Sequence, residues 1–171
     1  MATDETKSSI IQKLAFICLS LLILIISMTP LTMSTPKYPF PDLLMCFIFA
    51  FFINNKINTS WSAVLIVSLL ADLLWFRPIG LFTFFTVVGI EAVRWHLQTR
   101  NTLSVFVEMI YFYTFFVAVF LCVSFVKIIA RIPTTDFYYN INFVIFTLLT
   151  YPLISVLVKF FLMKKKSGYE N

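Results

Sequence analysis

Long apolar segments separated by short polar or proline-containing segments run along almost the whole chain. This pattern predicts six helices, because each apolar run is too long for a buried strand and ends at Pro, Asn or charged residues. The predicted ranges are 14–30, 42–53, 61–76, 80–97, 103–126 and 141–163. Most of them approach the roughly 20 apolar residues that a transmembrane helix needs. We therefore predict an all-α polytopic membrane protein with six transmembrane helices in one domain, residues 1–171.

The second of these segments is short for a membrane span. Its uninterrupted apolar run, Leu43 to Ile53, would be about 16 Å long as an α-helix. Pro41 and Asp42 precede it, and both residue types suit the beginning of a helix. Two arrangements stay open: six spans with both termini on one side of the membrane, or five spans with the termini on opposite sides.

The distribution of basic residues favours six spans. With both termini in the cytoplasm, nine of the 13 Lys and Arg residues lie on the cytoplasmic side, as the positive-inside rule requires. These nine are Lys7, Lys13, Lys56, Arg94, Arg100, Lys159, Lys164, Lys165 and Lys166.

The stretch 71–94 carries charged residues inside or beside apolar runs. We read it as two antiparallel helices joined by an Arg77-Pro78-Ile79-Gly80 turn, and we expect the other segments to pack around this hairpin. A carboxylate in a membrane is normally paired or turned toward other helices. Asp72 therefore has three interpretations: a staple within the hairpin that involves Arg77, a contact for a partner or ligand, or a proton-transfer group.

Three further charged residues lie near the predicted cytoplasmic side. Glu91 and Arg94 are three residues apart, a spacing that places them on one helix face within pairing distance. Glu108 lies one turn into the fifth segment, and we expect it to approach Arg94 or Arg100. Such a cluster either locks helices together or forms a proton or ion site.

The composition agrees with a membrane protein and argues against several other classes. Hydrophobic residues make up 60% of the chain, charged residues 12%, and the mean hydropathy is +0.94. The net charge of +5 comes from residues at the ends of apolar runs, so it does not indicate nucleic-acid binding. The three cysteines and the single histidine have no metal-ligand spacing, and no catalytic motif is present. We predict no enzyme activity, no metal and no cofactor.

Three motifs in order carry a family resemblance: PDLLMCFIFA at 41–50, LLADLLWFRPIGL at 69–81 and GIEAVR at 89–94. Together they resemble the rod shape-determining protein MreD family, and the length, basic ends and number of apolar segments are also similar. The resemblance marks six positions as motif matches: Pro41, Asp42, Asp72, Pro78, Gly80 and Glu91. With Arg77 and Arg94, which the charge pattern singles out, these are the predicted partner-binding or structural residues.

The resemblance implies a non-enzymatic component of the bacterial inner membrane with both termini in the cytoplasm. Such a protein would bind MreC, maintain rod shape, and help couple MreB to RodA and penicillin-binding protein 2 during peptidoglycan synthesis. The family's implied fold is the six-helix fold of the substrate-binding subunits of energy-coupling-factor transporters. That fold supplies the alternative function, a small-molecule binding subunit of a transporter.

Overall fold

The computed structural model describes residues 2–28, 39–54, 61–75, 78–97, 104–131 and 137–167. These residues are all-α, with six helices and no strand among them. The helices are α1 (Ala2–Met28), α2 (Leu43–Asn54), α3 (Trp61–Leu74), α4 (Leu81–His96), α5 (Val105–Ile129) and α6 (Phe137–Ser167).

Each apolar segment of the sequence corresponds to one helix, with shifted ends. α1 begins at Ala2 rather than at residue 14, so its first turns consist of polar residues. α6 likewise begins at Phe137 and continues to Ser167, beyond the expected range of 141–163. Hydropathy marks the apolar part of a helix, and the hydrogen-bonded backbone can continue past it in both directions.

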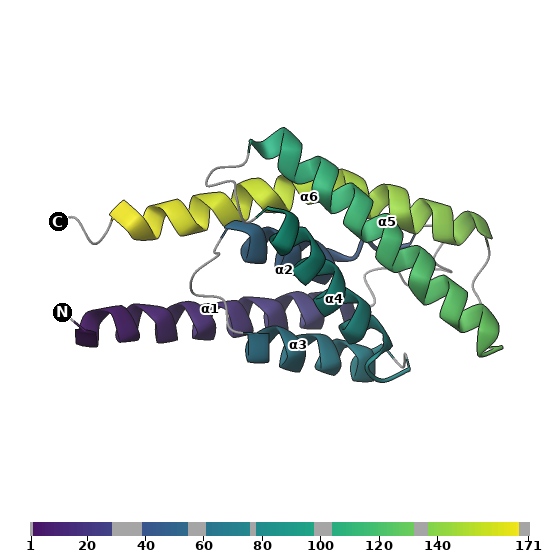
Figure 1. Cartoon of the computed structure of the whole chain (residues 1–171), viewed down its shortest axis with the longest axis horizontal. Helices are drawn as coiled ribbons and strands as arrows, with labels where there is room; N and C mark the ends of the chain where they lie inside the picture. Colours follow the sequence, from purple (N-terminus) through teal and green to yellow (C-terminus); the bar gives the residue numbers. More distant parts are fainter. Residues whose placement is uncertain are drawn as a thin grey trace.

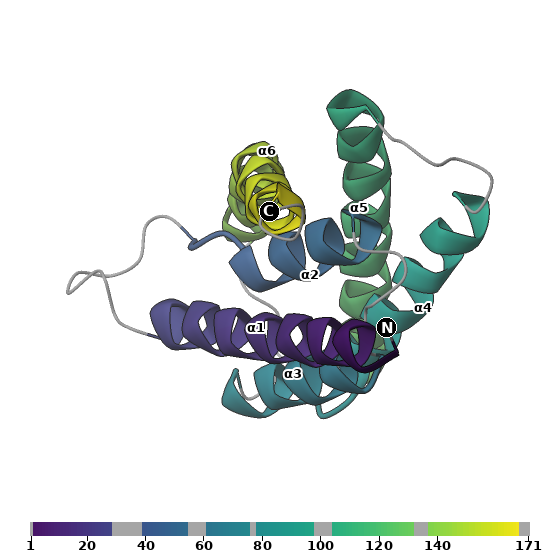
Figure 2. The ribbon, with the colours of Figure 1, turned by 90° about the vertical axis from the view of Figure 1, so that its left-hand side faces the viewer.

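Successive helices alternate in direction, so the beginning of α1 and the end of α6 lie at the same end of the bundle (Figure 1). Seen along the bundle, α2 lies between α1 and α6, and α3 covers the far side of α1 (Figure 2). α4 packs against α3 and α5, and α5 in turn contacts α6.

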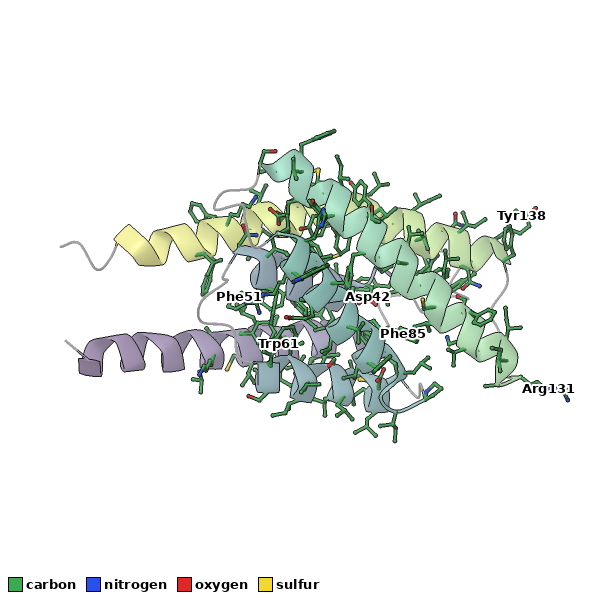
Figure 3. All side chains as sticks on the ribbon, viewed as in Figure 1. Asp42, Phe51, Trp61, Phe85, Arg131 and Tyr138 are labelled. Atoms are coloured by element: carbon green, nitrogen blue, oxygen red, sulfur yellow. The ribbon has the colours of Figure 1, made fainter. Side chains whose placement is uncertain are left out.

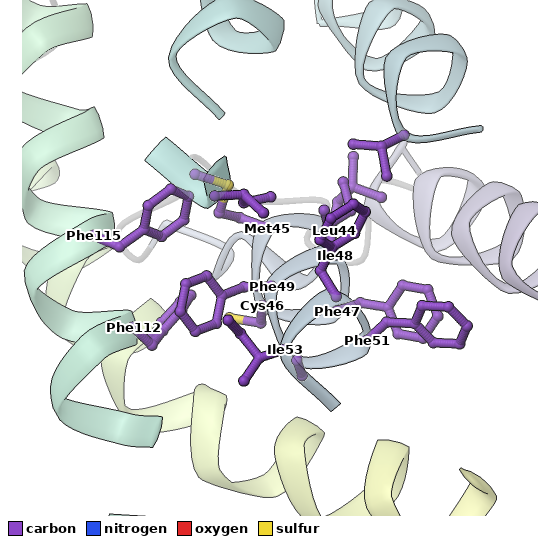
Figure 4. Close-up of a cluster of buried hydrophobic side chains, with 14 of the residues drawn as sticks. Leu44, Met45, Cys46, Phe47, Ile48, Phe49, Phe51, Ile53, Phe112 and Phe115 are labelled. Atoms are coloured by element: carbon purple, nitrogen blue, oxygen red, sulfur yellow. The ribbon is translucent and has the colours of Figure 1, made fainter. Parts of the chain in front are cut away.

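α2 is the centre of the bundle. All ten side chains from Leu44 to Ile53 are buried, on every face of the helix. Their side chains spread toward several neighbouring helices, and Phe49 meets Phe112 and Phe115 of α5 (Figure 4). A helix that is hydrophobic all round needs apolar neighbours on all sides, which explains why so short a helix lies inside the bundle.

This arrangement corrects the expectation that the 71–94 hairpin would be the centre of the fold. α3 and α4 form that hairpin, but both helices keep one face exposed, with large apolar side chains such as Ile66 and Phe84. The charged residues lie in the hairpin, whereas the uniformly apolar α2 makes the more central contacts. Its most extensive packing is with α6.

The outward faces of the described helices are strongly apolar. Two helices, Val105–Ile129 and Phe137–Leu162, are long and apolar enough to cross a membrane. Exposed Leu, Ile, Val and Phe side chains continue over α1, α3 and α4, a coverage far beyond the small apolar patches of soluble monomers. Arg131 and Tyr138 lie at the end of the bundle opposite the two termini (Figure 3), where charged and aromatic side chains suit a membrane interface.

α4 and α5 approach each other closely at Gly89. A Cβ atom built on this glycine would lie 2.5 Å from Cε2 and 2.8 Å from Cδ2 of Phe115. The Phe115 ring cannot move away easily, because it is buried and stacks on Phe49 with a centroid distance of 4.9 Å. The missing side chain of Gly89 therefore sets the distance between these two helices.

We predict that Gly89→Ala lowers the free energy of unfolding by about 1 to 2 kcal/mol, because the cost of overpacking exceeds the gain in helix propensity. Chemical denaturation in mild detergent, followed by Trp fluorescence, measures this change. Val88→Ala is the control, because Val88 is the adjacent residue of α4 and is 49% exposed. Equal stability of the Gly89→Ala variant and the wild type would contradict this account of the packing.

Candidate functional site

Asp72 closes the hairpin between α3 and α4. Its Oδ2 atom accepts hydrogen bonds from the backbone N–H of Gly80 at 3.0 Å, the backbone N–H of Thr83 at 3.3 Å and the Thr83 hydroxyl at 3.0 Å. These donors belong to the first turn of α4, whose own N-cap residue, Gly80, has no side chain to supply an acceptor. Asp72 therefore caps α4 from the neighbouring helix, with its negative charge at the positive end of the helix dipole.

The turn itself has the geometry that its sequence predicts. The Leu81 N–H donates to the Pro78 carbonyl at 3.1 Å, and Gly80 has φ 86° and ψ −10°, the values of the third residue of a type II turn. A positive φ at this position favours glycine. Asp72 thus makes hydrogen bonds between the two helices of the hairpin, whereas its expected partner Arg77 lies outside the described residues, so the predicted contact between the two stays a prediction.

Asp72 is completely buried, and its second oxygen, Oδ1, has no hydrogen-bond partner in the described part of the chain. A partner protein could not touch the carboxylate while the hairpin is closed. The geometry therefore gives Asp72 a role in holding α3 and α4 together.

Asp42 has a similar role at the beginning of α2. Its Oδ1 accepts the Met45 N–H at 3.0 Å, which makes it the N-cap of this helix, as Pro41 and Asp42 together predicted. Its own N–H donates to the Thr147 hydroxyl of α6 at 3.1 Å. Asp42 is 95% buried, so it joins α2 to α6 inside the bundle.

The expected pair of Glu91 and Arg94 is wrong. Glu91 is exposed, and the described residues contain no ion pair between the two side chains. The Arg94 guanidinium instead lies 5.1 Å from the centroid of the Phe52 ring and 5.6 Å from that of Trp61. Spacing of three residues permits a pair on a helix surface, but the two aromatic rings offer the guanidinium a less hydrated environment and cation–π contacts.

Glu108 is the centre of a buried polar cluster that joins three helices. Its Oε2 lies 2.5 Å from Nζ of Lys159, and its Oε1 accepts hydrogen bonds from Tyr151 at 2.7 Å, Ser155 at 2.8 Å and Asn54 at 3.1 Å. Glu108 comes from α5, Asn54 ends α2, and the other three residues lie on α6. We call these five residues the Glu108 cluster.

The Glu108 cluster differs from the sequence-based expectation that Glu108 would approach Arg94 or Arg100. Lys159 is its partner among the described residues, whereas Arg100 lies outside them. The sequence carried a usable signal, since Tyr151, Ser155 and Lys159 recur every four residues in an otherwise apolar segment. The sequence did not show that α6 packs against α5, so it could not identify Glu108 as the partner of these three residues.

The hollows between the described helices include one with a polar edge and one that is almost entirely apolar. The smaller, about 80 Å³, lies between α5 and α6 and has a polar edge of Asp42, Ser124, Lys127 and Asn140. The larger is a groove of about 660 Å³ between α1 and α6. The described residues that line this α1–α6 groove are apolar except Thr150: Leu19, Ile23, Leu43, Phe47, Phe51, Leu153, Ile154, Leu157, Val158, Phe160 and Phe161.

Helical spacing arranges the groove residues in parallel ridges. Leu43, Phe47 and Phe51 recur every four residues along α2 and form the floor. Leu153, Leu157 and Phe161 form a ridge with the same spacing on α6, and Leu19 and Ile23 form one on α1. Ridges of this kind form when helix residues repeat at i and i+4, and they interdigitate with the side-chain ridges of another helix.

The polar side chains and the groove suggest different kinds of role. Asp42, Asp72 and Glu108 all bond to groups within the bundle, and the described residues contain no cluster of three or more His, Cys, Asp or Glu residues that could bind a metal ion. The groove, in contrast, is a large and almost entirely apolar hollow among the described helices. Comparison of the chain with protein-family models, with curated proteins and with solved structures yields no match.

We predict that Asp72→Ala lowers the free energy of unfolding by about 2 to 4 kcal/mol, because it removes a helix cap and leaves the buried Thr83 hydroxyl without its acceptor. Asp72→Asn retains an acceptor oxygen, so its effect should be about half as large. Denaturant titration in detergent measures both variants.

Glu91→Ala serves as the control for this prediction, since it removes an exposed carboxylate from the same hairpin. Its stability should lie within about 0.5 kcal/mol of the wild type, as is usual for surface positions. If Asp72→Ala were as stable as Glu91→Ala, the interhelical cap would contribute nothing to the hairpin.

Proposed function

We propose that this chain is a non-enzymatic, multi-pass scaffold of the bacterial inner membrane that binds the transmembrane helix of MreC. The α1–α6 groove is the observation that carries this proposal, and the resemblance of the 41–50, 69–81 and 89–94 motifs to the MreD family supplies the partner. Through MreC, the scaffold would help couple MreB to RodA and penicillin-binding protein 2, and so maintain rod shape.

The size and lining of the groove suit one apolar helix. Its residues on α6 extend from Thr150 to Phe161, about 16 Å or three helical turns. Helices associate in membranes through close packing, because lipid tails are as apolar as the side chains themselves. The ridges on α1, α2 and α6 provide such packing on three sides of a bound helix.

The acidic residues would support this function indirectly. Asp42 and Asp72 cap helices inside the bundle, and Glu108 pairs with Lys159. In the proposal they maintain the shape of the scaffold, while apolar packing in the groove supplies the affinity for MreC. No step of this function requires turnover of a substrate.

A six-span topology with both termini in the cytoplasm is part of the proposal. The alternating helix directions and the shared end of α1 and α6 support it (Figure 1), as does the excess of Lys and Arg on that side of the sequence. The burial of α2 accounts for a short helix at membrane depth, since protein rather than lipid surrounds it.

A transporter subunit that binds a small molecule has less support. The polar-edged hollow between α5 and α6 measures about 80 Å³. Pockets for drug-sized ligands are usually about 300 to 1,000 Å³. The groove reaches that size, but nearly all of its lining residues are apolar, so it offers few groups that could orient a polar ligand.

We predict that Leu157→Trp reduces the amount of MreC that co-purifies with the chain by about tenfold, because the larger ring occupies the groove; this corresponds to about 1.4 kcal/mol. Full-length MreC and the tagged chain are co-expressed and purified in a mild detergent, and the ratio of the two proteins is measured.

Leu149→Trp is the matched control. Leu149 lies on the same helix and has a similar exposed fraction, 67% against 60% for Leu157, but it does not line the groove. This variant should recover MreC as well as the wild type does. Undiminished recovery with Leu157→Trp would exclude the groove as the binding site, and absence of MreC from the wild-type preparation would contradict the proposed function itself.

A further inference from the structure

The Glu108 cluster and the α1–α6 groove share one structural element, helix α6. Leu153, Leu157 and Phe161 face the groove, whereas Ser155 and Lys159 face Glu108 from another side of the same helix. Any rotation or shift of α6 that breaks the Glu108 cluster would therefore also move one wall of the groove.

We infer that the Glu108–Lys159 ion pair positions α6 and thereby sets the shape of the groove. The ion pair would then control the binding of a partner helix although neither of its residues contacts that helix. This inference rests on the proposed function for the identity of the partner. Glu108 and Lys159 are positioning residues in this view, since neither lines the groove.

The contacts around Glu108 allow a single register of α6. Tyr151, Ser155 and Lys159 bind the same carboxylate at successive four-residue intervals, and a shift by one residue would separate all three from it. The Tyr151 ring also stacks on Phe112 of α5, with a centroid distance of 3.8 Å and an interplanar angle of 7°. Hydrogen bonds, charge and ring stacking thus specify the same position of α6.

A buried ion pair is a weak device for stability alone. Removing two charges from water costs so much that well-packed apolar residues often stabilise a protein equally well or better. Glu108 is 99% buried, and the Lys159 side chain is only 17% exposed. The distinctive property of such a pair is geometric, because apolar side chains tolerate small rotations and shifts that a charged, hydrogen-bonded pair does not.

Pro152 explains why α6 would need an additional contact to fix its position. It lies inside α6, next to Tyr151, and proline removes one backbone hydrogen bond and disturbs the preceding turn. Without the cluster, apolar packing would have to fix the direction of the segment after Pro152. That segment carries most of the α6 wall, from Leu153 to Phe161.

The test separates stability from geometry by use of the double variant Glu108→Leu with Lys159→Met. Both charges disappear together, so no unpaired charge stays buried. Tyr151, Ser155 and Asn54 lose their acceptor, so we expect a lower denaturation midpoint than for the wild type. The midpoint should be higher than for Glu108→Leu alone, which also leaves the Lys159 charge without its partner. Recovery of MreC with the folded double variant should fall by at least about fivefold, the lower end of usual coupling between sites.

A distance measurement on the chain alone tests the geometry independently of MreC. One nitroxide label is attached to the native Cys18 of α1 and a second to Val156→Cys of α6, in a background with Cys122→Ser and Cys46→Ala. Cys18 and Val156 are exposed and do not line the groove. Pulsed electron spin resonance then reports the distribution of distances between α1 and α6.

We expect a narrow distribution for the wild type and a shifted or broadened one for the double variant. An unchanged distribution would overturn the inference, whatever the recovery of MreC. A changed distribution with undiminished MreC recovery would also overturn it, because the position of α6 would then not control binding. If the wild type recovers no MreC, the proposed function fails, but the distance measurement still decides whether the ion pair positions α6.

A second variant addresses the case in which the double variant does not fold. Tyr151→Phe with Ser155→Ala retains the ion pair and nearly all of the volume, but removes two of the hydrogen bonds to Glu108. Because the ion pair remains, the distance distribution should stay close to that of the wild type. A clearly shifted or broadened distribution would overturn the inference, because the two hydrogen bonds rather than the ion pair would then position α6.

Discussion

The packing of α2 against its neighbours determines the arrangement of the other helices. Every side chain from Leu44 to Ile53 is buried, so no face of this helix is left for lipid or water. α1, α4 and α6 each cover part of it, and Phe49 reaches the aromatic residues of α5. Because α1 and α6 cover different sides of α2, a groove remains between them with α2 as its floor.

Polar groups inside this apolar bundle act at the points where helices meet. Asp42 joins the beginning of α2 to α6, Asp72 joins α3 to α4, and Glu108 joins α5 to α6 and α2. Asp72 and Glu108 accept several hydrogen bonds or an ion pair, and Asp42 accepts the Met45 N–H while its own N–H donates to Thr147, as is expected where an unpaired charge would be very costly. At three places, therefore, a buried acidic residue bonds to a neighbouring helix and fixes the position of the two helices relative to each other.

Much of the local structure could be predicted from the sequence. Apolar run length predicted the six helices, proline and glycine predicted the Pro78–Gly80 turn, and Pro41 and Asp42 predicted the beginning of the second helix. These features depend on residues close together in the chain. The pair of Glu91 and Arg94 was also a local prediction, and it was wrong: the Arg94 guanidinium lies beside Phe52 and Trp61, which come from two other helices.

The sequence by itself therefore determined an all-α chain of apolar helices, their approximate ends, and the acidic residues that had to find partners. Tertiary structure alone decided that α2 rather than the hairpin is central, that Glu108 meets Lys159, and that α1 and α6 leave a groove between them. The physical reason is that hydropathy is nearly uniform around these helices. A periodic pattern can orient a helix in water, but where every face is apolar, only the fit of side chains between helices selects the neighbours.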